Sequence, residues 1–269
     1  MSLLDALLLG LIQGITEFLP VSSSGHLVMG QALLDVQIPG VAFEVAVHVA
    51  TLLSVLLVFR KRVAVLVVGV VRRDPEAWKY LGFIVLATLP AVAVGLGARH
   101  ALEGLFDVPE VAAVALLVTG SFLWTSKRAM ARNPNGKPGA REAILVGLAQ
   151  AFAIIPGISR SGATVVTGLW LGLEAEEAAT FSFLMAVPAI LGAAVLELPD
   201  LLAVGGGGVG LGSGLGGGAL LLGSAAAGRA GVLAIWAFLA MLKRKSFHRF
   251  GPYCWAVGSL FLLYLLVRG

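Results

Sequence analysis

Residues 13–26, which read QGITEFLPVSSSGH, hold the first group of side chains that could do chemistry. They combine the amide of Gln13, the carboxylate of Glu17, three consecutive hydroxyls beginning at Ser22 and the imidazole of His26. Polar groups at this density are not tolerated against lipid tails. They must therefore be buried in protein or line a water-filled cavity.

Ser23 and His26 are a candidate nucleophile and general base. A serine hydroxyl is a weak nucleophile until a neighbouring base takes its proton. The two residues are three apart, which places them on one side of a helix if a half-helix begins here. The alternative is that the serines cap the N-terminus of that half-helix. Both interpretations can hold, because one serine can cap while another reacts.

A second polar stretch, residues 156–164 (PGISRSGAT), centres on Arg160. A cation in a break between apolar segments is costly unless an anion compensates it. The planar guanidinium suits bidentate binding of phosphate or carboxylate, and the start of the following half-helix also favours an anion. Ser159, Ser161 and Thr164 add hydrogen-bond donors. We therefore expect the two polar stretches to meet and form one site for an anionic substrate.

Glu17 lies one turn beyond Gln13, so both side chains share one face of a half-helix. A buried carboxylate could ligate Mg²⁺ or Ca²⁺, orient a base, or pair with Arg160. One carboxylate and one amide would complete a metal site only together with substrate phosphates. The alternative for Arg160 is a structural ion pair with Glu17 that joins the two stretches.

Glu44 and His48 are four residues apart on one face of the first full span, where both should point into the bundle. They could tune His26 or line the cavity. The alternative is a mutually hydrogen-bonded pair that steadies the helix.

The composition indicates an all-α integral membrane protein. The chain is 58% hydrophobic and 13% charged, whereas a soluble domain has roughly twice that charged fraction. Its apolar runs are continuous, unlike the alternating strands of a β-barrel. The net charge is +4, but no basic domain lies outside the membrane, so nucleic-acid binding is not expected. The single cysteine, Cys254, excludes an intramolecular disulfide.

Six segments are apolar and long enough to be read as membrane spans, and they lie at about 41–59, 81–98, 111–126, 177–197, 218–242 and 252–268. Two further segments, about 2–36 and 141–173, are apolar but broken in the middle by Pro, Gly and polar residues. Each is predicted to be a re-entrant hairpin of two half-helices. The Gly-rich segment 205–218 is predicted to be a flexible loop.

Basic residues and an internal repeat predict the topology. Fifteen of the 19 basic residues lie in three loops, at 60–79, 127–141 and 243–249, which we place in the cytoplasm. A shift of 137 residues superimposes the first polar stretch on the second and the first three spans on the last three. Each half, 1–132 and 133–269, would then be a hairpin plus three spans. Because three is odd, the halves would be inverted, with the hairpins entering from opposite faces.

The two polar stretches, together with Phe43, Glu44 and His48, resemble the signature motifs of the bacterial undecaprenyl-diphosphatase family, also called bacitracin-resistance proteins. The resemblance extends over essentially the whole chain. It implies a multi-pass enzyme of the bacterial inner membrane, with its site toward the extracytoplasmic side. Such an enzyme removes the terminal phosphate of a polyprenyl diphosphate lipid, which regenerates the carrier for peptidoglycan synthesis and confers bacitracin resistance.

By motif position, the resemblance implies that Arg160 binds the diphosphate. Ser23 and His26 would be nucleophile and base, and Glu17 would bind metal or substrate. Gln13, Ser22, Ser159, Ser161 and Thr164 would surround the substrate. The family is similar in needing a divalent cation, usually Mg²⁺ or Ca²⁺. Many members have Glu where this chain has Gln13, which puts a two-carboxylate metal site in doubt.

Other function classes remain open from the sequence. Inverted repeats suit alternating access, so a transporter or flippase of a polyprenyl phosphate lipid is the main alternative. An ion channel or a scaffold is a weaker one. A homodimer is left open.

Overall fold

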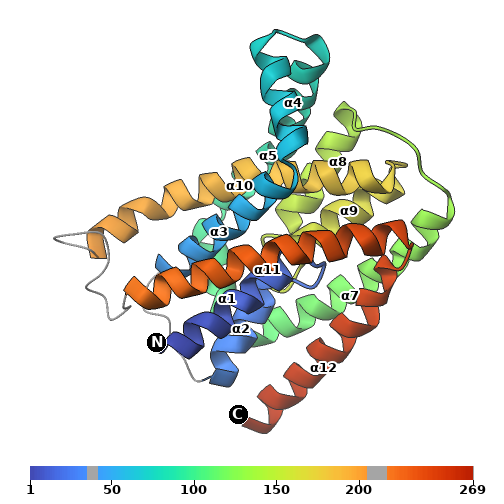
Figure 1. The fold of residues 1–269 in the computed structure, drawn as a ribbon. Helices are drawn as coiled ribbons and strands as arrows, with labels where there is room; N and C mark the ends of the chain where they lie inside the picture. The colour runs from blue at the N-terminus through green and yellow to red at the C-terminus, as the bar shows by residue number, and fades with distance from the viewer. Residues whose placement is uncertain (35–41, 205–216, 269) are drawn as a thin grey trace.

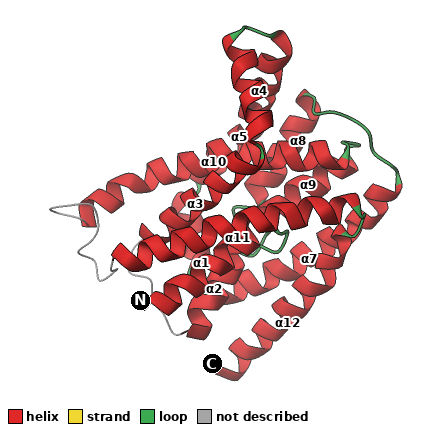
Figure 2. Ribbon diagram, in the orientation of Figure 1, coloured by secondary structure: helices red, strands yellow, loops and turns green. Residues whose placement is uncertain are grey.

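The computed structural model describes residues 1–34, 42–204 and 217–268. Within these ranges every regular element is a helix (Figure 2), apart from one isolated bridge between Gly136 and Leu173. The predicted all-α class is confirmed. Most of the predicted Gly-rich loop, residues 205–216, lies outside the described residues.

Both predicted hairpins form pairs of short helices joined by irregular turns. The first pair is α1 (Leu3–Phe18) and α2 (Ser23–Leu34), and the second is α8 (Ala140–Phe152) and α9 (Arg160–Trp170). Each turn contains a proline, which has no N–H to donate and favours a break in the helix. The turns fall at the polar stretches, as expected.

Six longer helices correspond to the six predicted spans. They are α3 (Ala42–Val58), α5 (Pro75–Gly97), α7 (Pro109–Ala131), α10 (Ala175–Val204), α11 (Gly217–Lys243) and α12 (Phe250–Arg268). Five of them are long and apolar enough to cross a membrane. The sixth, α3, is apolar but has only 17 residues.

Three elements lie outside the predicted spans and hairpins: α4 (Arg60–Val71), α6 (Arg99–Phe106) and the 3-10 turn η1 (Phe247–Arg249). α4 is the largest departure, because a helical hairpin replaces the expected loop between the first two spans. The Asp74 side chain caps α5 by accepting from the Ala77 N–H at 3.2 Å, which ends one helix and starts the next.

The two halves exchange packing partners. α1 packs along α11, α8 packs along α5, and α7 packs along α12 (Figure 1). Glycines allow the close approach: a Cβ on Gly10 would collide with the backbone of Gly223, and one on Gly147 would collide with the backbone of Ala87. The first helix of each hairpin therefore packs on the second long helix of the other half. The halves cannot separate without opening both interfaces.

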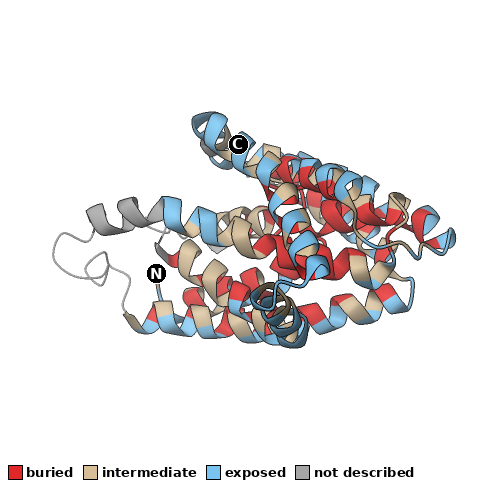
Figure 3. Ribbon diagram, turned by 90° about the horizontal axis from the view of Figure 1, so that it is seen from above, coloured by how far each residue is buried: buried red, intermediate tan, exposed pale blue. Residues whose placement is uncertain are grey.

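Buried residues concentrate in the interior of the helical bundle, and its projecting ends are mostly exposed (Figure 3). A chain of edge-to-face aromatic contacts runs from Phe18 at the end of α1 through Phe183 and Phe238 to Phe247, with ring centroids 5.6, 5.0 and 5.2 Å apart. Glu17 precedes Phe18 and Ser182 precedes Phe183. This packing therefore fixes the end of the first half-helix against α10.

Candidate active site

The turns of the two hairpins are in direct contact. The Ser161 hydroxyl donates to the Leu19 carbonyl at 3.3 Å. A Cβ on Gly25 would lie 3.1 Å from the Gly157 Cα. Gly157 has φ +93° and packs against the Ala112 carbonyl, so a side chain there would be both strained and obstructed. Glycine is therefore needed at this position for the second turn to pack against α7.

Two serines cap the helices that follow the turns. Ser159 is the N-cap of α9 and accepts from the Gly162 N–H at 3.1 Å. Ser22 accepts from the Gly25 N–H at 3.3 Å and has a left-handed backbone, φ 69°, which is uncommon for a residue other than glycine. Because Ser22 takes the capping position, the Ser23 hydroxyl is free for another partner.

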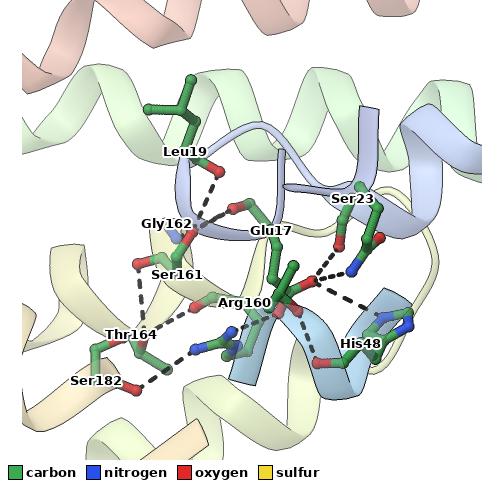
Figure 4. A network of polar contacts seen from close by, with 12 residues as sticks. Glu17, Leu19, Ser23, His48, Arg160, Ser161, Gly162, Thr164 and Ser182 are labelled. Atoms are coloured by element: carbon green, nitrogen blue, oxygen red, sulfur yellow. Dashed lines mark hydrogen bonds and ion pairs between the residues drawn. The ribbon is translucent and has the colours of Figure 1, made fainter. Parts of the chain in front are cut away.

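Glu17 is the centre of the cluster (Figure 4). Its Oε1 accepts from Arg160 Nη2 at 2.6 Å. Its Oε2 accepts from Ser23 Oγ at 2.7 Å and from Gln13 Nε2 at 3.1 Å, and it lies 3.9 Å from His48 Nε2. The Glu17 side chain is only 7% exposed. One buried carboxylate thus joins a cation, a hydroxyl and an amide from both hairpins.

Arg160 is held from two sides. Besides Glu17, its Nη1 approaches the Ser182 carbonyl of α10 at 3.5 Å. The Thr164 hydroxyl is hydrogen-bonded to the Ser182 hydroxyl at 2.6 Å and donates to the Arg160 carbonyl at 2.7 Å. A guanidinium has five N–H donors, so donors remain for an anionic ligand.

The polar network contains three residues that sequence reasoning missed: Thr119, Ser182 and Tyr253. The Thr119 hydroxyl donates to the Gly157 carbonyl at 2.9 Å and accepts from the Ser159 N–H at 3.1 Å, which braces the second turn. Thr119 and Ser182 are hydroxyl residues inside apolar helices. The only available signal was a hydroxyl inside a span, and this does not indicate which turn it faces.

His26 does not contact Ser23 in this structure. Its Nδ1 lies 2.8 Å from the Ser22 carbonyl, which can only accept, so Nδ1 carries the proton. Its Nε2 lies 2.9 Å from the Tyr253 hydroxyl, and the two rings stack. The expected Ser23–His26 pair is therefore absent, because the ring turns toward α12 while the Ser23 hydroxyl turns toward α1. The assignment of His26 as base stays a prediction.

His48 provides an imidazole beside Glu17. Its Nδ1 donates to the Glu44 carbonyl at 2.7 Å, which points Nε2 toward Glu17 Oε2. The Glu44 carboxylate is instead contacted by Gln31 Nε2 at 3.4 Å. His48 is thus hydrogen-bonded to the backbone carbonyl of Glu44 and not to its carboxylate. The His48 ring faces the cluster around Glu17.

The oxygen atoms near Glu17 are the ligands that this part of the chain could offer to a bound cation. Among the described residues, no three His, Cys, Asp or Glu side chains lie together as a metal-binding group. Gln13 Oε1 is buried and has no hydrogen-bond partner in the described part of the chain. A hard divalent cation prefers oxygen ligands. Gln13 and Glu17 therefore fit such a cation only if substrate oxygens complete its coordination.

Comparison with known proteins shows which family the chain resembles. The family model described as bacitracin resistance protein BacA matches residues 6–260. A relative from Desulforapulum autotrophicum is 37% identical over 98% of both chains. One from Desulfosudis oleivorans is 39% identical over 96% of this chain and 97% of its own. One from Salinibacter ruber is 40% identical over 95% of this chain and 97% of its own.

Each of these relatives is named undecaprenyl-diphosphatase. The family match begins within α1 and ends within α12, so it includes both hairpin turns, five of the six long helices and the first part of the sixth. The chain belongs to the bacitracin resistance protein family.

Proposed function

We propose that this protein is a phosphatase of the bacterial inner membrane that hydrolyses undecaprenyl diphosphate to undecaprenyl phosphate and inorganic phosphate. The observation that carries this proposal is the buried cluster of Arg160, Glu17 and Ser23 at the contact of two hairpins. It combines an anion-binding cation with a hydroxyl whose proton already has an acceptor. A lipid substrate accounts for the depth of the site, because the prenyl tail can stay in the bilayer.

Substrate binding would begin at Arg160. Its unused N–H donors and the N-terminus of α9 favour the terminal phosphate. A bound phosphate competes with Glu17 for the guanidinium, so the carboxylate loses part of its counter-charge. Glu17 then becomes a better proton acceptor for Ser23, whose hydroxyl is already 2.7 Å away. The ion pair thus couples substrate binding to activation of the nucleophile.

The chemical step moves one proton and one phosphoryl group. The Ser23 oxygen attacks the terminal phosphorus, its proton passes to Glu17 Oε2, and undecaprenyl phosphate leaves. Water then attacks the phosphoserine, the P–O bond to Ser23 breaks, and Glu17 returns its proton to the Ser23 oxygen. Both protons of the water leave with inorganic phosphate, so the hydroxyl and the carboxylate are both restored. Arg160 stabilises the charge on the phosphoryl oxygens. His48 would hold the carboxylate in place, and His26 could act as base only after its ring leaves Tyr253.

A divalent cation, Mg²⁺ or Ca²⁺, is part of the proposal. Gln13 Oε1 and Glu17 would contact it, with substrate phosphates supplying the remaining oxygens. When bound, the cation would neutralise charge on the diphosphate. The unpartnered, buried Gln13 Oε1 supports this placement.

The inverted repeat and an extracytoplasmic opening of the site are also proposals. The reciprocal packing of α1 on α11 and α8 on α5 supports an inverted pair of halves. The basic loops support placing the end of the protein that is opposite to this opening in the cytoplasm.

The test is inorganic phosphate release from undecaprenyl diphosphate by the purified protein, with and without EDTA. We expect release that EDTA suppresses and that Arg160→Ala abolishes. No release under any divalent-cation condition would contradict the proposal. A flippase, in contrast, would move lipid without releasing phosphate and would tolerate Ser23→Ala.

A further inference from the structure

The hairpin of α4 and the first turns of α5 projects from the helical bundle (Figure 1). None of the 12 residues of α4 is buried. Beyond the three basic residues at its start, the exposed side chains of α4 are apolar: Val65, Val67, Val68 and Val71 are 67, 55, 46 and 76% exposed. A stripe of valines of this extent would be unfavourable in bulk water. Some apolar medium therefore covers it.

The charge of this segment is strongly positive. Residues 60–79 contain six Lys or Arg and two acidic residues, a net charge as large as the +4 of the whole chain. Arg60 and Lys61 lie at the base of α4, and Arg72 and Arg73 lie at its tip. The valines thus lie between two basic ends. Lys and Arg clusters beside a membrane helix attract anionic lipid headgroups.

The length of α5 sets the depth of the hairpin. Its 23 residues make a helix about 35 Å long. The hydrocarbon core of a bilayer is about 30 Å thick, and the bilayer including its headgroups is about 40–45 Å thick. α4 packs beside the first turns of α5, where Gly69 faces Ala77 and Trp78 Nε1 donates to the Val70 carbonyl at 3.1 Å. The hairpin therefore lies at headgroup depth rather than in bulk water.

We propose that α4 is a docking surface for anionic lipid headgroups of the membrane in which the protein is embedded. The valines face the upper acyl chains, and the arginines at the tip contact lipid phosphates. A second copy of the chain is disfavoured as the occupant, because the same positive segments would face each other. This surface is independent of the phosphatase site.

The test uses the full chain in vesicles of phosphatidylcholine with increasing phosphatidylglycerol. Val71→Cys carries an environment-sensitive fluorophore, while the buried Cys254 stays unlabelled. Asn135→Cys, in the exposed linker between α7 and α8, is the matched control. We expect quenching of the Val71→Cys probe by headgroup-level nitroxide lipids, increasing with phosphatidylglycerol. The control probe should be quenched only by aqueous iodide.

A charge variant tests the anionic preference. In the Val71→Cys background, we measure the phosphatidylglycerol fraction that gives half of the maximal quenching by nitroxide lipids. Arg72→Gln should raise this fraction by about fivefold, because one charge is lost. Arg128→Gln, at the end of α7, should leave it unchanged. The proposal is overturned if the Val71→Cys probe behaves like the control, if quenching ignores phosphatidylglycerol, or if Val71→Cys crosslinks two copies. Phosphate release is measured in parallel, so a failure of either proposal is seen separately.

Discussion

The two hairpins have similar local structure but carry different chemistry. A shift of 137 residues places Gln13 on Gln150, Glu17 on Ile154 and Ser23 on Arg160. In the first hairpin the Gln13 amide donates to Glu17. In the second, Gln150 is buried and neither of its amide atoms has a partner among the described residues. Only the first hairpin has a carboxylate at this position, and only the second has a cation.

The turns also differ in the residue that takes the unusual backbone conformation. The first turn places Ser22 at φ 69°, whereas the second uses Gly157 at φ +93° and leaves Ser159 at φ −74°. A serine with a left-handed backbone is held only if its surroundings over-determine it. The comparison indicates that the two hairpins carry complementary groups, which the Glu17–Arg160 contact brings together.

Removing the cation should have the largest effect. Arg160→Ala leaves Glu17 buried without its counter-charge, which should lower the free energy of unfolding by about 3–5 kcal/mol and phosphate release by about 10²–10³-fold or more. Thermal unfolding and phosphate release check the two effects. Glu17→Gln in the Arg160→Ala background should recover part of the stability but no activity. Near-normal release by Arg160→Ala would show that the two hairpins do not form one site.

Ser23→Ala should nearly abolish phosphate release with little change in stability, because a hydroxyl hydrogen bond contributes about 1 kcal/mol. Ser24→Ala is the matched control, since the Ser24 hydroxyl bonds Ser22 rather than Glu17. Trapping of radiolabelled phosphate on the wild-type protein would detect the phosphoserine. If Ser24→Ala were as inactive as Ser23→Ala, the assignment of the nucleophile would be wrong.

Substitution of His48 and removal of the Tyr253 hydroxyl that contacts His26 should differ in their effect on phosphate release. His48→Gln should lower phosphate release by about tenfold or more, because it removes the imidazole that lies against Glu17. Tyr253→Phe removes only the partner of His26, so release should stay close to that of the wild type. The opposite ranking, with a silent His48→Gln and an inactive His26→Ala, would support His26 as the base and require its ring to turn.

The smallest effect should come from substituting Gln150 of the second hairpin, whose buried amide has no partner among the described residues. Gln150→Leu should leave the protein equally stable or more stable by about 1–2 kcal/mol, because it removes a buried polar group without partners. Gln13→Leu should instead reduce phosphate release, since it removes a hydrogen bond to Glu17. Thermal unfolding of Gln150→Leu and phosphate release by Gln13→Leu check the comparison. A marked loss of stability in Gln150→Leu would reveal an unrecognised partner for its amide.

Much of the architecture follows from local sequence features. Long apolar runs predict the six long helices, and the interruptions at 13–26 and 156–164 predict the two hairpins. The same reasoning missed α4, because its valines and flanking arginines are too short a segment for a span and look like a basic loop. It also missed Tyr253 and Ser182, since nothing local indicates which helix a single hydroxyl faces.

Local physics, namely hydropathy, helix breaking at proline and the charge of loops, is therefore enough to predict helices, breaks and the residue types available for chemistry. The pairing of those residues is not local. Glu17 and Arg160 are 143 positions apart, and their contact depends on how α1 and α9 pack against α10 and α11. The side-chain conformations in which Ser23 bonds to Glu17 and His26 bonds to Tyr253 depend on the same packing. For this reason the sequence indicated which residue types could do chemistry, while the folded chain determined which of them meet.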